Sequence, residues 1–182
     1  MKKGEKLLGN ISVRYLILFV LGLLGNEIFY LIFLPLTIFP VNFLLKFFFS
    51  TSLVSSIIYI NNLPIEIIGA CVAGSAYYLL LILNLSTPGI KIKKRIALLI
   101  FTFLSLLILN VLRIFLLSML FVSGTSFFDL AHKLFWYAGS TLFVVGIWFL
   151  GVWLFKIKEI PFYSDIKSLC ENYKKIKTKK KR

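Results

Sequence analysis

Long apolar stretches separated by short polar segments run through most of this chain. The apolar stretches cover residues 13–34, 70–85, 96–121 and 134–155, and each carries few charges. A helix needs about 20 apolar residues to cross the roughly 30 Å hydrocarbon core of a bilayer. The pattern therefore predicts about four transmembrane helices in one bundle, since no long polar stretch marks a separate soluble domain.

The segment at residues 35–69 departs from this pattern. In the predicted topology this segment begins and ends on the outer side of the membrane. It is too short for two spans and a turn, so it is not expected to cross the membrane. Pro35 and Pro40 interrupt the helical pattern near its start. Residues 36–49 form an apolar run, in which polar residues recur every four positions at Asn42 and Lys46, with Ser50 directly after it. We expect an amphipathic helix here that lies in the outer interface or packs back into the bundle.

Two segments rich in β-branched residues follow, at residues 54–60 and 63–68, and they flank Asn61 and Asn62. An Asn pair between such segments is typical of a tight β-hairpin. Pro64 removes one backbone donor, which suits an edge position. The hairpin would lead the chain to the start of the next apolar stretch.

Positive charge is concentrated in a few places along the chain. Of the 21 Lys and Arg residues, all but Lys46, Arg113 and Lys133 lie near the N-terminus, within residues 91–95 or after Phe155. Such clustering marks the cytoplasmic ends of membrane spans. It argues against nucleic acid as the partner, despite a net charge of +14. The mean hydropathy of +0.93 also favours a membrane protein.

These features predict an all-α membrane protein with about four transmembrane helices and both termini cytoplasmic. An outer interfacial helix and a small β-hairpin would precede Cys71. Residues 1–155 would form a single transmembrane bundle that carries any catalytic site, with residues 35–69 as its outer cap. Residues 156–182 would form a basic cytoplasmic tail.

In this topology three unusual residues reach the same outer membrane face: Cys71, Arg113 and His132. His132 is the only histidine, and Arg113 lies inside an apolar stretch. The other cysteine, Cys170, falls in the cytoplasmic tail, so a disulfide within the molecule is not expected. A cysteine nucleophile needs a base and a donor for the oxyanion, and this set supplies one of each.

Each of the three residues also has a plainer structural interpretation. Cys71 begins a predicted helix whose dipole would favour a thiolate, but it could equally fill a gap between helices. Arg113, in the outer third of its span, could bind an oxyanion, form a structural pair or snorkel to the interface. His132 could transfer protons or only form a hydrogen bond at the interface.

Three further polar residues could support this set. Asn110 lies three residues before Arg113 on the same helical face and could orient its guanidinium. Glu27, in the outer half of the first span, is the candidate counter-ion. Asp129 lies one turn before His132 and could hold its tautomer. No strong metal-ligand set is present, no cofactor is expected, and no G-x-S-x-G elbow marks a serine hydrolase.

In its motifs the chain resembles the exosortase/archaeosortase family, over roughly residues 36–154. The resemblance is carried by Cys71 opening a span after a hairpin, by the NVLR sequence at residues 110–113 and by the DLAH sequence at residues 129–132. The sequence GACVAGSAYY at residues 69–78 looks closer to a compact archaeosortase than to a bacterial exosortase.

The resemblance implies a membrane-embedded cysteine transpeptidase. Cys71 would form a thioester with the substrate, His132 would act as acid and base, and Arg113 would stabilise the thiolate or the oxyanion. The substrates would be exported proteins that end in a short motif, a transmembrane helix and a basic cluster. They would be cut at the outer face of an archaeal cell membrane and transferred to an acceptor, expected to be a membrane lipid.

Two questions stay open at this point. Either His132 or Arg113 could activate the thiol. The chain could also be a non-catalytic membrane assembly or lipid-binding protein, in which Arg113 and Glu27 form a structural pair. A transporter is less favoured, because no two spans show matching breaks at mid-depth.

Overall fold

Helices make up most of the chain, as the apolar pattern predicts, and one small antiparallel sheet interrupts them. This computed structural model describes residues 2–24, 27–135 and 140–180. The helices are α1 (Lys2–Leu23), α2 (Glu27–Leu45), α3 (Gly69–Val72), α4 (Gly74–Leu85), α5 (Ile92–Val122), α6 (Phe127–Leu134), α7 (Ser140–Leu154) and α8 (Tyr163–Lys180). The strands are β1 (Thr51–Val54), β2 (Ile57–Ile60) and β3 (Leu63–Glu66).

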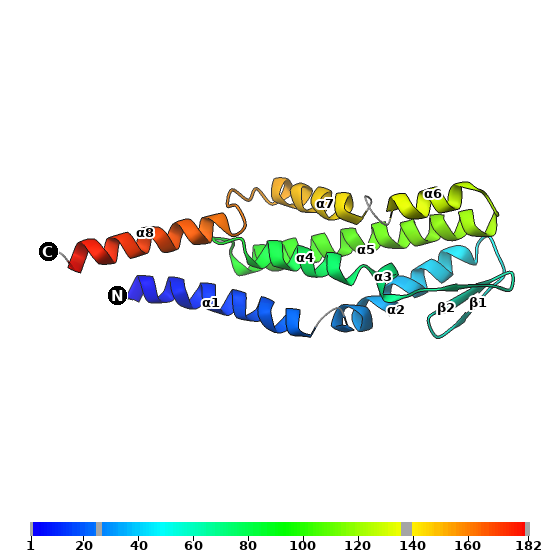
Figure 1. The fold of residues 1–182 in the computed structure, drawn as a ribbon, viewed down its shortest axis with the longest axis horizontal. Helices are drawn as coiled ribbons and strands as arrows, with labels where there is room; N and C mark the ends of the chain where they lie inside the picture. The colour runs from blue at the N-terminus through cyan, green and yellow to red at the C-terminus, as the bar shows by residue number, and fades with distance from the viewer. Residues whose placement is uncertain (1, 25–26, 136–139, 181–182) are drawn as a thin grey trace.

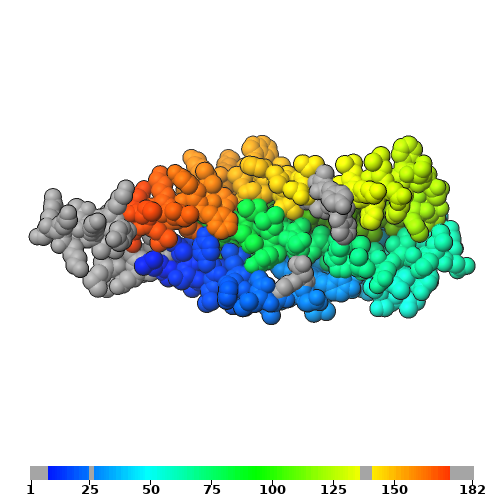
Figure 2. Space-filling model, viewed as in Figure 1, coloured from blue at the N-terminus to red at the C-terminus, as the bar shows by residue number. Residues whose placement is uncertain are grey.

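The helices run along the long axis of the molecule in alternating directions (Figure 1). The chain follows α1 and α2 toward the sheet, returns along α3 and α4, follows α5 toward the sheet again and returns along α6 and α7. α1 begins and α8 ends at the end of the molecule opposite the sheet. In the space-filling view, α8 (orange) lies beside α1 (blue) (Figure 2). Each pass except α5 is thus divided between two helices.

The predicted span at residues 13–34 is divided in the structure. α1 ends at Leu23, and α2 begins at Glu27. Residues 25 and 26, between the two helices, lie outside the described residues. The prediction of one continuous helix over this stretch is therefore wrong.

A separate interfacial helix at residues 36–49 is not present, because the residues up to Leu45 belong to α2; of the two expected placements, this segment takes the one that packs back into the bundle. α2 continues through Pro35 and Pro40, and its buried face packs against α4 and α5. This packing outweighs the backbone hydrogen bond that each proline removes. Asn42, one of the polar residues behind the prediction, is buried and accepts a hydrogen bond from the Thr51 hydroxyl (2.9 Å). That bond joins α2 to β1.

The predicted hairpin is present, and an additional strand joins it. β2 and β3 pair antiparallel across Asn61 and Asn62, which both have positive φ, as a tight hairpin turn requires. β1, which was not predicted, pairs with β2 across a second turn at Ser55. The strand order is β1-β2-β3, so β3 forms an edge. Ile58 and Ile60 of β2 are fully buried and attach the sheet to the core.

Close packing holds the helices together. The ring of Tyr77 on α4 stacks on Phe33 of α2, with centroids 3.6 Å apart, and meets Phe103 of α5 edge-on. α7 approaches α5 at Gly151, where an added Cβ would come within 2.9 Å of the Leu98 side chain. Small residues allow such approaches between apolar helices that have little else to hold them together.

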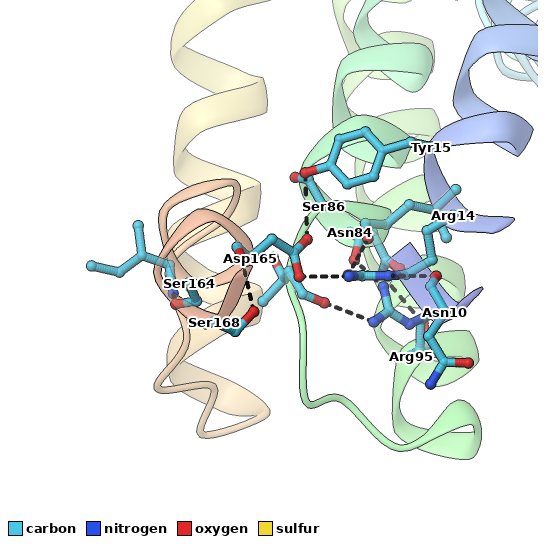
Figure 3. A network of polar contacts seen from close by, with 12 residues as sticks. Asn10, Arg14, Tyr15, Asn84, Ser86, Arg95, Ser164, Asp165 and Ser168 are labelled. Atoms are coloured by element: carbon cyan, nitrogen blue, oxygen red, sulfur yellow. Dashed lines mark hydrogen bonds and ion pairs between the residues drawn. The ribbon is translucent and has the colours of Figure 1, made fainter. Parts of the chain in front are cut away.

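A polar network joins α1, α4, α5 and α8 at the end opposite the sheet (Figure 3). Arg14 forms an ion pair with Asp165 (2.6 Å) and donates a hydrogen bond to the carbonyl of Leu85 (2.8 Å). Arg95 donates to carbonyls near the end of α4. The charge pattern of the sequence predicts only that these arginines lie on the cytoplasmic side. In the structure they bind backbone and side chains, and Asp165 attaches the start of the tail to the bundle.

α2 and α5 are long and apolar enough to cross a membrane, judged by length and composition within the described residues. α5 has 31 residues and so measures about 46 Å, more than the roughly 30 Å of a hydrocarbon core. Three shorter apolar helical stretches accompany them: Leu8–Leu23, Gly69–Leu85 and Thr141–Leu154. These helices favour association with a membrane.

Candidate active site

Cys71, Arg113 and His132 line one cavity of about 310 Å³ beside the sheet. Cys71 comes from α3, Arg113 from α5 and His132 from α6. Three segments far apart in the sequence thus place a thiol, a guanidinium and an imidazole around the same cavity, as expected from the sequence. The other walls are mostly apolar and come from β3, from the residues that follow it and from α5.

Cys71 lies in a helix of only four residues, shorter than predicted. α3 ends at Val72, because Ala73 adopts a left-handed backbone (φ +60°) before α4 begins at Gly74. The predicted helix over residues 70–85 is therefore interrupted after its first turn. A single turn has little macrodipole, so the predicted stabilisation of a thiolate by a long helix does not apply.

Asn110 holds the backbone at Cys71. Its side-chain amide donates a hydrogen bond to the Cys71 carbonyl (2.8 Å), which joins α5 to α3. The Cys71 amide in turn donates to the Ile68 carbonyl (2.8 Å). Asn110 is only 2% exposed, so water competes little for this bond. This contact was not predicted, since Asn110 was expected to orient Arg113.

Arg113 is buried and lies close enough to Cys71 for the two groups to interact electrostatically. A guanidinium in this place would stabilise a thiolate or a developing oxyanion. Glu27, the predicted counter-ion, is exposed and lines a separate hollow with Tyr30 and Ser75.

His132 lies on α6, and its ring stacks on that of Phe128, with centroids 5.5 Å apart. His132 is exposed as well as lining the cavity, so a proton could pass between it and water. Asp129 lies on the same helix but is exposed and does not line the cavity. The predicted last span at residues 134–155 corresponds to the end of α6 and to α7, and residues 136–139 lie outside the described residues.

One wall of the cavity was not predicted from the sequence. Pro64, Ile65 and Glu66 of β3 line it, and so does Ser118 of α5, which is 3% exposed. The hairpin signal could have placed β3 near Cys71, because the strand ends five residues before it. Nothing in the sequence pattern marks Ser118.

The arrangement has the groups needed for nucleophilic attack on a carbonyl: a thiol, an imidazole and a guanidinium around a largely apolar space. In the described part of the chain, no group of three or more His, Cys, Asp or Glu side chains is placed to hold a metal ion. No family model, curated protein or solved structure matches this chain.

Proposed function

We propose that this protein is a multi-pass membrane cysteine transpeptidase that cleaves a C-terminal sorting signal of exported proteins. The observation that carries the proposal is the shared cavity of Cys71, Arg113 and His132. The resemblance of residues 110–113 and 129–132 to exosortase/archaeosortase motifs supports it. The proposed reaction uses no metal and no cofactor.

In the proposed arrangement the spans in the cell membrane are α1 with α2, α3 with α4, α5, and α6 with α7. The basic residues of the N-terminal segment, the start of α5 and the tail would lie on the cytoplasmic side. Arg113 follows Ile96 by 17 residues, about 25 Å along α5, which corresponds to the outer part of the bilayer. The open edge of β3 also favours a position outside the hydrocarbon, because lipid cannot satisfy unpaired backbone groups.

The proposed reaction begins when Cys71 transfers its proton to His132 and attacks the scissile carbonyl. Arg113 stabilises the negative charge that develops on the carbonyl oxygen. As the carbon–nitrogen bond breaks, protonated His132 gives its proton to the leaving amine, and a thioester to Cys71 remains. An acceptor hydroxyl or amine loses its proton to His132 and attacks the thioester, which releases the product and the Cys71 thiolate.

The proposed substrates are exported proteins whose C-terminus carries a short motif, a transmembrane helix and a basic cluster. The substrate helix would pack on the apolar outer surface near the cavity, where Phe127 and Leu130 of α6 are exposed. Its basic cluster would stay on the cytoplasmic side. The proposed acceptor is a membrane lipid, since the cavity would open at the bilayer surface.

Replacement of Cys71 by alanine tests this function. Cys71→Ala should abolish removal of the C-terminal tail from exported proteins, because no thioester can form, while the protein is still expressed. The measurement is mass spectrometry of exported proteins from cells that carry wild type, Cys71→Ala or Cys170→Ser. The Cys170→Ser control should process tails normally, since Cys170 is exposed on α8, away from the cavity. Normal processing in Cys71→Ala would overturn the proposal and favour a non-catalytic assembly or lipid-binding protein.

A further inference from the structure

β3 is one of the two edge strands of the sheet, and its open edge continues into the cavity that contains Cys71. β3 pairs with β2, and within the described residues no other strand lies beyond it. Pro64 and Glu66 are exposed, so a partner can reach this edge. The same two residues line the cavity. The edge and the thiol therefore belong to one continuous surface.

The register of β3 shows which backbone groups face the open edge. In an antiparallel pair, residues that hydrogen-bond to the partner strand alternate with residues whose N–H and C=O point away from it. Ile67 donates to the carbonyl of Ser56 (2.9 Å), so Ile65, two residues earlier, also bonds toward β2. Pro64 and Glu66 therefore direct their carbonyls to the open edge, and Glu66 also directs its N–H there.

We propose that the substrate segment next to the scissile bond binds β3 as an added strand, an inference that rests on the proposed function. Glu66 offers one donor and one acceptor, and Pro64 offers a second acceptor two residues away, about 6.8 Å along the strand. An extended peptide carries donors and acceptors at the same spacing. A lipid headgroup or a small ion has no such repeat. Pairing here brings the scissile carbonyl to the cavity of Cys71.

Alkylation of Cys71 by peptide probes tests this pairing. The protein is placed in lipid vesicles with Cys170→Ser, which leaves Cys71 as its one thiol. The probes are acetyl-tetraalanine chloromethyl ketone and derivatives that are N-methylated at one amide each. Methylation at alternate amides should slow alkylation on the order of three- to tenfold, because each of these methyl groups removes one hydrogen bond to β3. Methylation at the amides between them should have little effect, because these amides point away from β3. A flat methylation profile would overturn the proposal.

A substitution in β3 gives a second test. Glu66→Pro removes the outward N–H and leaves the bonds to β2, because the N–H of Glu66 does not take part in them. The rate of alkylation by the unmethylated peptide, divided by the rate with iodoacetamide in the same variant, should be about tenfold lower than in Glu66→Ala, which loses the same carboxylate from the cavity wall. Glu66→Ala, the matched control, keeps the N–H and should keep the alternating profile. Equal peptide rates in Glu66→Pro and Glu66→Ala, each divided by its own iodoacetamide rate, would contradict strand pairing.

The methylation profile is measured on the Cys170→Ser protein, which has no substitution in β3. It therefore tests strand pairing even if Glu66→Pro disturbs the fold. The two proposals also fail separately. A flat profile together with loss of tail removal in Cys71→Ala refutes the strand pairing and leaves the transpeptidase. An alternating profile together with normal tail removal in Cys71→Ala refutes the transpeptidase.

Discussion

Asn110 and Arg113 lie one turn apart on α5 and serve different parts of the cavity. Asn110 donates a hydrogen bond to the backbone carbonyl of Cys71, whereas Arg113 lies within electrostatic range of its thiol. Their spacing predicts a shared helical face, and both are buried on α5. Their individual partners could not be predicted, because these depend on how α3 packs against α5.

Asn110→Ala tests the positioning of Cys71. The substitution leaves the Cys71 carbonyl without its donor, which should cost about 1–3 kcal/mol of stability. It should also slow alkylation of Cys71 by iodoacetamide several-fold, because α3 is no longer held with the thiol beside Arg113. Asn42→Ala is the matched control, since it removes a buried hydrogen bond between α2 and β1 instead. Equal alkylation rates in the two variants would show that Asn110 does not position the thiol.

Local sequence signals predict the turn of the hairpin, but they do not predict where the helices begin and end. The hairpin followed from Asn61 and Asn62, whose side chains favour the left-handed backbone that the turn requires. The continuation of α2 through Pro35 and Pro40 was missed, because tertiary packing outweighs local propensity there. The break at Ala73 was missed because alanine normally favours a helix.

The contact between α5 and α7 should depend on Gly151. Gly151→Leu should destabilise the protein by about 1–3 kcal/mol, because the new side chain meets the fully buried Leu98 and overpacks this contact. Gly146→Leu on the same helix is the control, since no atom lies within 4 Å of an added Cβ there. Thermal unfolding in detergent gives the melting temperature of each variant. A similar melting temperature for the two variants would contradict the close approach of α7 to α5.

At the scale of the whole molecule, the two ends of the bundle differ in chemistry. One end holds α8 to α1 through the ion pair of Arg14 and Asp165 (Figure 3). The other end holds the sheet and the cavity of Cys71. The ion pair could not be predicted from the sequence. Asp165 lies in a mostly basic tail, 151 residues from Arg14, and nothing local indicates that its carboxylate is buried. The difference between the ends matches the proposed orientation, with the basic end in the cytoplasm.

In the proposed topology Cys71 faces outward, where it can meet exported substrates. Labelling of single-cysteine variants in intact cells with a membrane-impermeant maleimide tests this topology. Cys71, in the Cys170→Ser background, should be labelled in intact cells. Cys170, in the Cys71→Ser background, should be labelled only after the membrane is permeabilised. Labelling of Cys170 in intact cells, with Cys71 protected until permeabilisation, would rule out this topology.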